Sequence, residues 1–152
     1  EREWHLATLT AMIGQWLSRI WPSRPSARHD SSYLPLDEDP AWHEMRRYDG
    51  IVRAASDAAL AEAPADLPPV RDRNLGTSVG PIHGVACYVF ETDADLALAT
   101  GRQLTDWLTE ATKHQLLLHG YPAHVIDHFD VSFVSHEEIV RKAGGNYHHY
   151  FN

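Results

Sequence analysis

The fold is decided by residues 128–152, HFDVSFVSHEEIVRKAGGNYHHYFN, because residue types in this stretch mark where each element begins and ends. Its first part alternates large apolar residues with polar ones, at Phe129, Val131 and Phe133. Side chains two residues apart point to the same face of a strand, so this alternation predicts a half-buried strand that ends at Val134.

A helix with clear limits follows this strand. Ser135 followed by Glu138 three residues later predicts a helix start with a reciprocal capping box. Gly144 and Gly145 predict the end of the helix, because glycine adopts the left-handed conformation that commonly closes one. The aromatic residues in 147–151 then favour a closing strand.

Outward from this segment, residues 85–91 are apolar at both alternating sets of positions, as in an inner strand that is covered on both faces. Thr92 and Asp95 resemble a capping box, and one long helix is expected from there to a stop at Gly120 and Pro122. A strand, a helix and another strand predict a parallel crossover connection, which is right-handed in nearly all proteins.

Further toward the N-terminus, Asp39 and Pro40 predict the start of another helix, since Asp accepts from free amides and Pro has no amide hydrogen to leave unpaired. Prolines from Pro64 onward end it, and residues 64–84 are expected to form a long loop. The glycines in this loop do not indicate nucleotide binding, because the run precedes a strand and lacks the lysine of a phosphate-binding loop.

The first segment, residues 1–21, has apolar residues at three- and four-residue steps, which predicts an amphipathic helix. Residues 22–39 are rich in Pro, Ser, Arg and acidic residues and are expected to be a linker-like loop, so the first helix is a possible detachable arm. Its apolar stripe requires a partner, which is the rest of this domain, another subunit or a membrane interface. The chain as a whole, residues 1–152, is interpreted as a single domain.

The expected fold class is therefore α+β, or a small α/β fold. Two N-terminal helices are followed by the order β-α-β-α-β, which gives a small mixed sheet with helices packed on it. A hydrophobic content of 43% and a charged content of 22% are ordinary values for a globular protein.

The net charge of −8 repels phosphate backbones, so we expect no nucleic-acid partner and favour a basic protein partner. Cys87 is the only cysteine, which excludes an intrachain disulfide and fits a reducing compartment. It lies in an apolar run and is interpreted as a buried thiol. The sequence shows no signal peptide and no segment apolar and long enough for an integral membrane protein, so a cytoplasmic location is expected.

Among the residue types with acid–base or metal-binding chemistry, histidine is unusually frequent, with eleven in the chain. Imidazole and carboxylate groups bind metals and transfer protons near neutral pH, so one hypothesis is a metal or catalytic site built from C-terminal residues. Its candidate residues are His124, His128, His136 and Asp127. The pattern at His136 departs from the zinc-protease helix motif, since Val140 stands where that motif has its second histidine.

The pattern of residues 131–140 followed by residues 144–151, VSFVSHEEIV and GGNYHHYF, resembles the C-terminal part of small bacterial immunity proteins from toxin–immunity systems. The resemblance implies a non-enzymatic cytosolic protein that needs no cofactor and neutralises a cognate toxin domain, which in many such systems is basic. Acidic side chains at expected loops and helix starts are the candidate partner contacts: Asp37, Glu38, Asp39, Asp93 and Asp95.

Two other functions remain open at this point. One is a metal-dependent enzyme that uses the C-terminal His, Asp and Glu residues. The other is a regulatory or structural subunit that docks on a partner through its N-terminal helix, with the linker as a tether.

Overall fold

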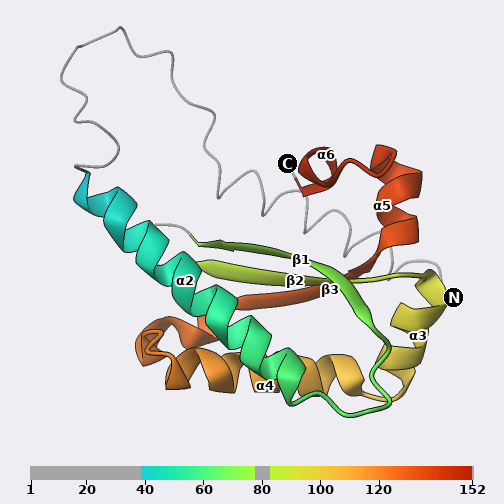
Figure 1. The fold of residues 1–152 in the computed structure, drawn as a ribbon, viewed down its shortest axis with the longest axis horizontal. Coiled ribbons are helices and arrows are strands. Elements are labelled where there is room, and N and C mark those ends of the chain that lie inside the picture. The colour runs from blue at the N-terminus through green and yellow to red at the C-terminus, as the bar shows by residue number, and fades with distance from the viewer. Residues whose placement is uncertain (1–38, 78–82, 152) are drawn as a thin grey trace, which may run out of the picture.

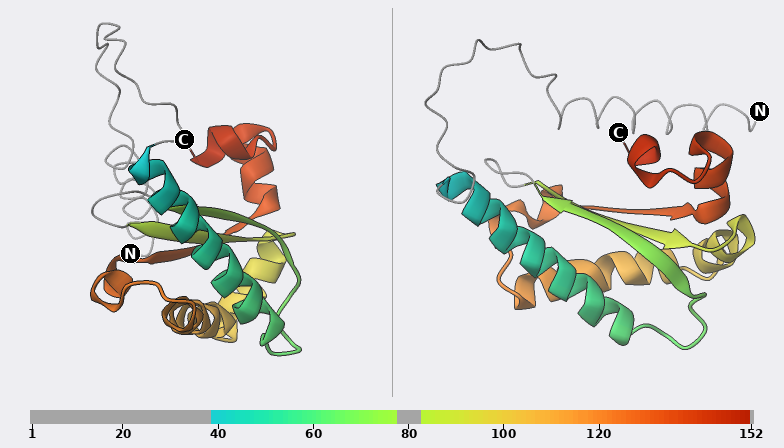
Figure 2. Two further views of the ribbon diagram at one scale, coloured as in Figure 1. Left: turned by 60° about the vertical axis from the view of Figure 1, so that its left-hand side comes forward. Right: turned by 45° about the horizontal axis from the view of Figure 1, so that its top comes forward.

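The computed structural model describes residues 39–77 and 83–151, which form a three-layer α+β body around a small mixed sheet (Figures 1 and 2). The predicted first helix, residues 1–21, lies outside the described residues, as does the predicted linker of residues 22–39 apart from Asp39. The elements are α2 (Pro40–Ala61), β1 (Val70–Thr77), β2 (Gly84–Phe90), α3 (Asp93–Gly101), α4 (Leu104–Leu118), the 3₁₀ helix η1 (Ala123–His128), β3 (Asp130–Ser135), α5 (His136–Ala143) and α6 (Tyr147–Phe151).

The sheet has the strand order β1-β2-β3. Strands β2 and β3 are parallel, with α3 and α4 between them in the chain, so the predicted crossover is confirmed. Strand β1 pairs with β2 in the antiparallel direction and makes the sheet mixed. The central strand β2 is almost fully buried, as its apolar residues on both faces predict.

Helix α2 begins where the sequence predicts it, because the Asp39 side chain accepts a hydrogen bond from the Ala41 amide at 2.9 Å and Pro40 occupies the first turn. The second half of the helix supplies the buried face, with Tyr48, Val52, Ala55, Ser56 and Ala59. The buried face therefore begins at Tyr48, whereas Ala41 is exposed.

The larger core lies between the sheet and the layer of α2 and α4; in Figure 1 α4 lies below the strands and α2 crosses in front of them. Ala86 and Tyr88 of β2 meet Leu108 and Leu116 of α4 there. The Tyr88 hydroxyl lies 2.7 Å from Thr112 Oγ1, which donates to the Leu108 carbonyl. Since a buried hydroxyl without a partner is costly, this bond fixes how α4 lies against β2.

The opposite face of β2 carries a smaller core. Cys87 and Val89 pack with Val134 of β3 and Ile139 of α5, and the aromatic residues of α6 cover them. Burial raises the pKa of the Cys87 thiol to about 11, so the thiol is protonated at neutral pH. The interpretation of Cys87 as a small buried residue is confirmed.

The prediction of a loop over residues 64–84 is wrong for residues 70–77, which form strand β1. The register pairs Asp72 with Val89, Asn74 with Cys87 and Gly76 with Val85. No residue of β1 is fully buried, so the strand lacks the apolar run that reveals β2. The hydrogen-bonded pairing with β2, rather than a buried apolar face, therefore stabilises β1.

The predicted closing strand over residues 147–151 is also wrong, because this segment is the short helix α6. Gly144 and Gly145 both have positive φ values, 60° and 83°, and confirm the predicted stop of α5. The Asn146 side chain then accepts from the His149 amide at 3.0 Å, which starts a new helical turn. The aromatic residues reach the second core from one side of this turn.

The single long helix expected after Thr92 is two helices. Gln103 has a φ of 60°, a left-handed conformation that is uncommon for residues with a side chain, and it separates α3 from α4. The chain changes direction there, so the buried residues do not follow one helical stripe: Ala97 is exposed, whereas Ala99 and Leu104 are buried.

Candidate functional site

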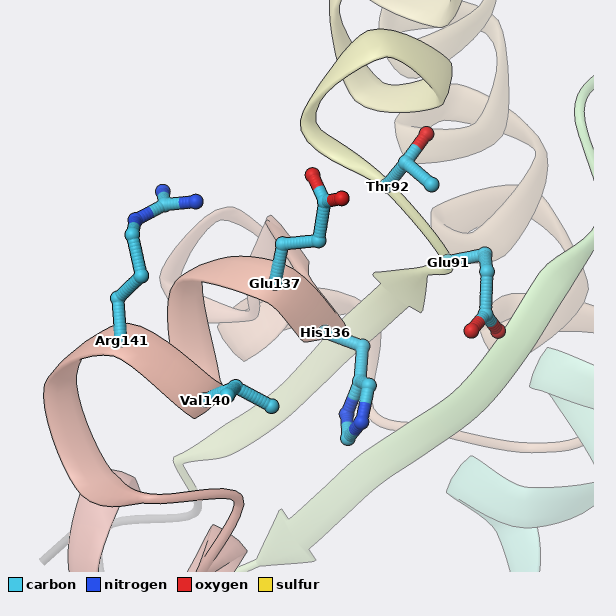
Figure 3. Close-up of a pocket in the computed structure, with 6 residues that line it drawn as sticks. All are labelled: Glu91, Thr92, His136, Glu137, Val140 and Arg141. Carbon is cyan, nitrogen blue, oxygen red and sulfur yellow. The ribbon is translucent and has the colours of Figure 1, made fainter.

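A shallow groove of about 390 Å³ lies at the carboxyl ends of the two parallel strands. Strand β2 leads there into α3, and β3 leads into α5. Figure 3 shows the side chains that line the groove, which come from these two junctions: Glu91, Thr92, His136, Glu137, Val140 and Arg141.

The groove lies where the chain leaves neighbouring parallel strands toward opposite layers. After β2 the chain enters the layer of α3 and α4, whereas after β3 it enters the layer of α5 and α6 (Figures 1 and 2). In open α/β sheets, ligands commonly bind beside such a point, because the diverging connections leave a crevice and helix N-termini face it.

This protein fills part of that crevice with its own carboxylates. The Glu137 side chain accepts a hydrogen bond at 2.9 Å from the amide of Asp93, the first residue of α3. An anionic ligand at a helix N-terminus depends on such free amides. A protein carboxylate therefore occupies a position that would suit a phosphate, which makes an anion-binding role of this groove unfavourable.

Asp93 connects α3 to α5. One carboxylate oxygen accepts from the Ser135 hydroxyl, and the other accepts from Arg141 at 2.5 Å. These interactions, first the hydrogen bond from Arg141, hold the pKa of the Asp93 carboxyl below its ordinary value. Ser135 also accepts from the Glu138 amide at 2.9 Å, so the cap of α5 is present. The predicted reciprocal half of the capping box is wrong, because the Glu138 carboxylate accepts from Lys142 and Tyr150 instead of reaching back to the Ser135 amide.

The other side of the groove has its own polar contacts. Arg71 of β1 donates to both carboxylate oxygens of Glu91 at 2.6 Å. The His136 ring stacks on Tyr147, with ring centres 5.9 Å apart, and its Nδ1 lies 3.2 Å from the Tyr147 hydroxyl. Figure 3 shows Glu91 and His136 extending to the same side of the two strand ends. The groups with acid–base chemistry around the groove therefore have structural partners.

Two of the three acidic candidates within the described residues, Asp39 and Asp95, take part in helix caps. Asp39 caps α2, and Asp95 completes a reciprocal capping box with Thr92, which accepts from the Asp95 amide at 3.0 Å. Asp93 borders the groove through the contacts described above. The remaining candidates, Asp37 and Glu38, lie outside the described residues.

The four candidate metal ligands lie at the two ends of β3. His124, Asp127 and His128 belong to η1, which precedes the strand, whereas His136 follows it at the start of α5. A 3₁₀ helix has about three residues per turn, so residues four apart lie on different faces of η1. Within residues 39–77 and 83–151, no group of three His, Cys, Asp or Glu side chains is arranged to hold a metal ion.

His128 instead meets another part of the chain. Its ring lies edge-on to that of His83, with centres 6.2 Å apart. Asp130 is close to both, and burial raises the pKa of its carboxyl while Lys113 and the two imidazoles act in the opposite direction. This cluster stands at the amino end of the sheet, away from the groove.

The groove residues that the sequence analysis did not single out as a site are Glu91, Glu137, Val140 and Arg141. Val140 is 47% exposed although it belongs to an amphipathic helix. The capping residues Thr92 and Ser135 were the sequence signal that could have located the groove. Each marks a helix that follows a parallel strand, and such helix starts meet at one edge of a sheet.

Comparisons with known proteins do not assign a family. No family model matches the chain, and neither a curated protein nor a solved structure is significantly similar to it. In the part of the chain that the structure describes, no helix has the length and apolarity to cross a membrane.

Proposed function

We propose that this chain is a non-enzymatic binding protein of the immunity class, which neutralises a basic bacterial toxin domain in the cytoplasm. The observation that carries the proposal is the charge of the folded body. The described ranges hold sixteen of the twenty-one acidic side chains but only nine of the thirteen basic ones. Such an excess attracts a basic partner and speeds the encounter with it.

The ion pairs within the body support this proposal. Five are present among the described residues, and they use Arg71, Arg73, Arg102, Arg141 and Lys142. More than half of the cations in these ranges thus already face a carboxylate of the same chain. Exposed acidic residues such as Asp106 and Glu110 on α4 remain to give the surface its negative potential.

The groove is the favoured contact surface for one basic side chain of the partner. Glu91 and Glu137 supply two carboxylates, and Val140 offers an exposed apolar surface between helix turns. Lysine and arginine carry a charge at the end of an apolar stem, so the stem packs on Val140 while the charge reaches a carboxylate. The contacts with Arg71 and the Asp93 amide hold these carboxylates in place before binding.

The test is co-expression with basic candidate toxins from the source of the chain, combined with purified binding measurements. We expect the chain to restore growth and to bind the same toxin, with an affinity that decreases as salt is raised. Restored growth without direct binding, or binding that does not respond to salt, would contradict the proposal.

A further inference from the structure

Among the described residues, α5 and α6 cover the sheet face opposite α2 and α4 over only part of its length. Among the seven residues of β2, Val85 alone is half-buried, whereas Cys87 and Val89 on the same face are buried beneath α5 and α6. Helices α5 and α6 lie over the carboxyl end of β2 and do not extend over its amino end, as Figure 1 shows.

On the uncovered part, glycine and short polar side chains surround Val85. In the sheet register Val85 lies between Gly76 of β1 and Asp130 of β3, and Asn74 and Ser132 flank Cys87 one step further along. A Cβ atom added to Gly76 would lie 3.6 Å from the Val85 side chain, at ordinary contact distance. Gly76 beside Val85 allows a helix to approach this side of the sheet closely.

The chain enters the described body next to this surface. Thr77, at the end of β1, donates to the Asp49 carboxylate and the Met45 carbonyl near the start of α2. Asp39 therefore stands at the end of the sheet where Val85 is uncovered, and Figure 1 shows the start of α2 at that end. The preceding 38 residues join the body there.

These residues contain a suitable occupant. An apolar stripe recurs at helical spacing in the sequence, at Leu6, Leu9, Ile13, Trp16, Leu17 and Ile20. In helical form it would be about 22 Å long, more than enough to cover the amino end of β2. Residues 21–38 span up to about 60 Å when extended, which is ample for the stripe to return onto the sheet.

We propose that the apolar stripe of residues 6–20 docks within the same chain on the sheet surface around Val85. Docking extends the second core toward the amino end of β2 and shields the exposed side of the sheet. This inference is independent of the proposed function, because it concerns an internal contact on the face away from α2 and α4.

The test measures how fast a thiol reagent labels a cysteine introduced at the centre of the surface, in the full-length chain carrying Val85→Cys. The native Cys87 is buried and serves as an internal control for opening of the body. Two further substitutions are compared in this background. Ile13→Glu places a charge in the stripe, and Gln15→Glu places the same charge on the opposite helix face.

We expect Ile13→Glu to accelerate labelling at position 85 at least tenfold, and Gln15→Glu to leave the rate unchanged. A cysteine introduced by Leu118→Cys, at a site 66% exposed, should label equally fast in all backgrounds. Equal rates at position 85 in all three backgrounds would overturn the proposal and leave this surface to another partner.

Two controls keep the result interpretable. Protection of position 85 that is lost on dilution would assign the contact to a second copy of the chain, which would also overturn the proposal. If Ile13→Glu exposes Cys87 as well, the comparison is repeated with the milder Ile13→Thr. Selective labelling at position 85 then supports the contact, and its absence contradicts it.

Discussion

The two ends of strand β2 are built in different ways. At the amino end, Gly84 lies against the rings of Tyr121 and Phe129, and close packing leaves no room for a side chain. At the carboxyl end, hydrogen bonds between helix caps join α3 to α5 beside an open groove. The difference separates a region that specifies the fold from one whose polar groups are accessible to a partner.

The largest effect is expected from Gly84→Ala at the packed end. The added Cβ would lie 2.4 Å from a Phe129 ring carbon and 2.8 Å from the Tyr121 hydroxyl, so the rings must move. Overpacking of this kind costs about 3 kcal/mol. Urea denaturation measures the loss, and Gly76→Ala in β1 is the matched control because its Cβ meets only an ordinary contact. Similar losses for both variants would contradict the distinction.

A smaller loss is expected from Ser135→Ala at the polar end. The variant removes the cap of α5 and the hydroxyl that donates to Asp93. Loss of a helix cap costs about 1 kcal/mol, and Asp93 remains solvated. Ser132→Ala, on the same strand but away from a helix start, should cost less in the same denaturation experiment. An equal or greater cost at position 132 would show that capping does not stabilise this end.

Tyr121→Phe should stabilise the packed end slightly. The Tyr121 hydroxyl is buried and has no hydrogen-bond partner among the described residues, and burial raises its pKa to about 12. Removing an unsatisfied buried hydroxyl should raise the free energy of unfolding by about 1 kcal/mol. Tyr88→Phe is the contrasting variant, since Tyr88 has a partner in Thr112 and its loss should destabilise the protein. Destabilisation by Tyr121→Phe would refute this description of the site.

The smallest effect is expected in the acid titration of the polar end. Because the folded pKa of Asp93 is lowered, its contribution is fully present above the unfolded value of about 3.9 and is lost as the pH falls through the folded value. Asp93→Asn should therefore flatten the pH dependence of stability below about pH 4. Unfolding curves at several pH values measure this, and an unchanged slope would show that Asp93 is not coupled to folding.

The sequence predicts the parts of the fold that have strong local signals. Asp39 and Pro40 place the start of α2, Thr92 and Ser135 place two more helix starts, and the apolar run in β2 identifies the inner strand. These features depend on side chains close in sequence, or on burial of a continuous run. They therefore remain visible without knowledge of the tertiary structure.

The incorrect predictions concern residues whose conformation depends on distant partners. Strand β1 has no buried residue and is defined by its pairing with β2. Segment 147–151 is the helix α6, although its aromatic residues favour a strand. The groove also depends on this pairing, because Arg71 of β1 holds Glu91 across the sheet. Local patterns contain no information about such contacts, so the site was not predicted as a unit.

The most direct test of the central claim compares two charge-matched double variants in binding to the basic toxin domain that we propose as the partner. Glu91→Gln with Glu137→Gln changes the groove, and Asp106→Asn with Glu110→Gln removes the same charge from the exposed side of α4. We predict that the groove variant binds at least tenfold more weakly at constant salt, while the α4 variant changes affinity less than threefold. Equal weakening by both variants, or a larger effect from α4, would contradict the assignment of the groove as the binding site.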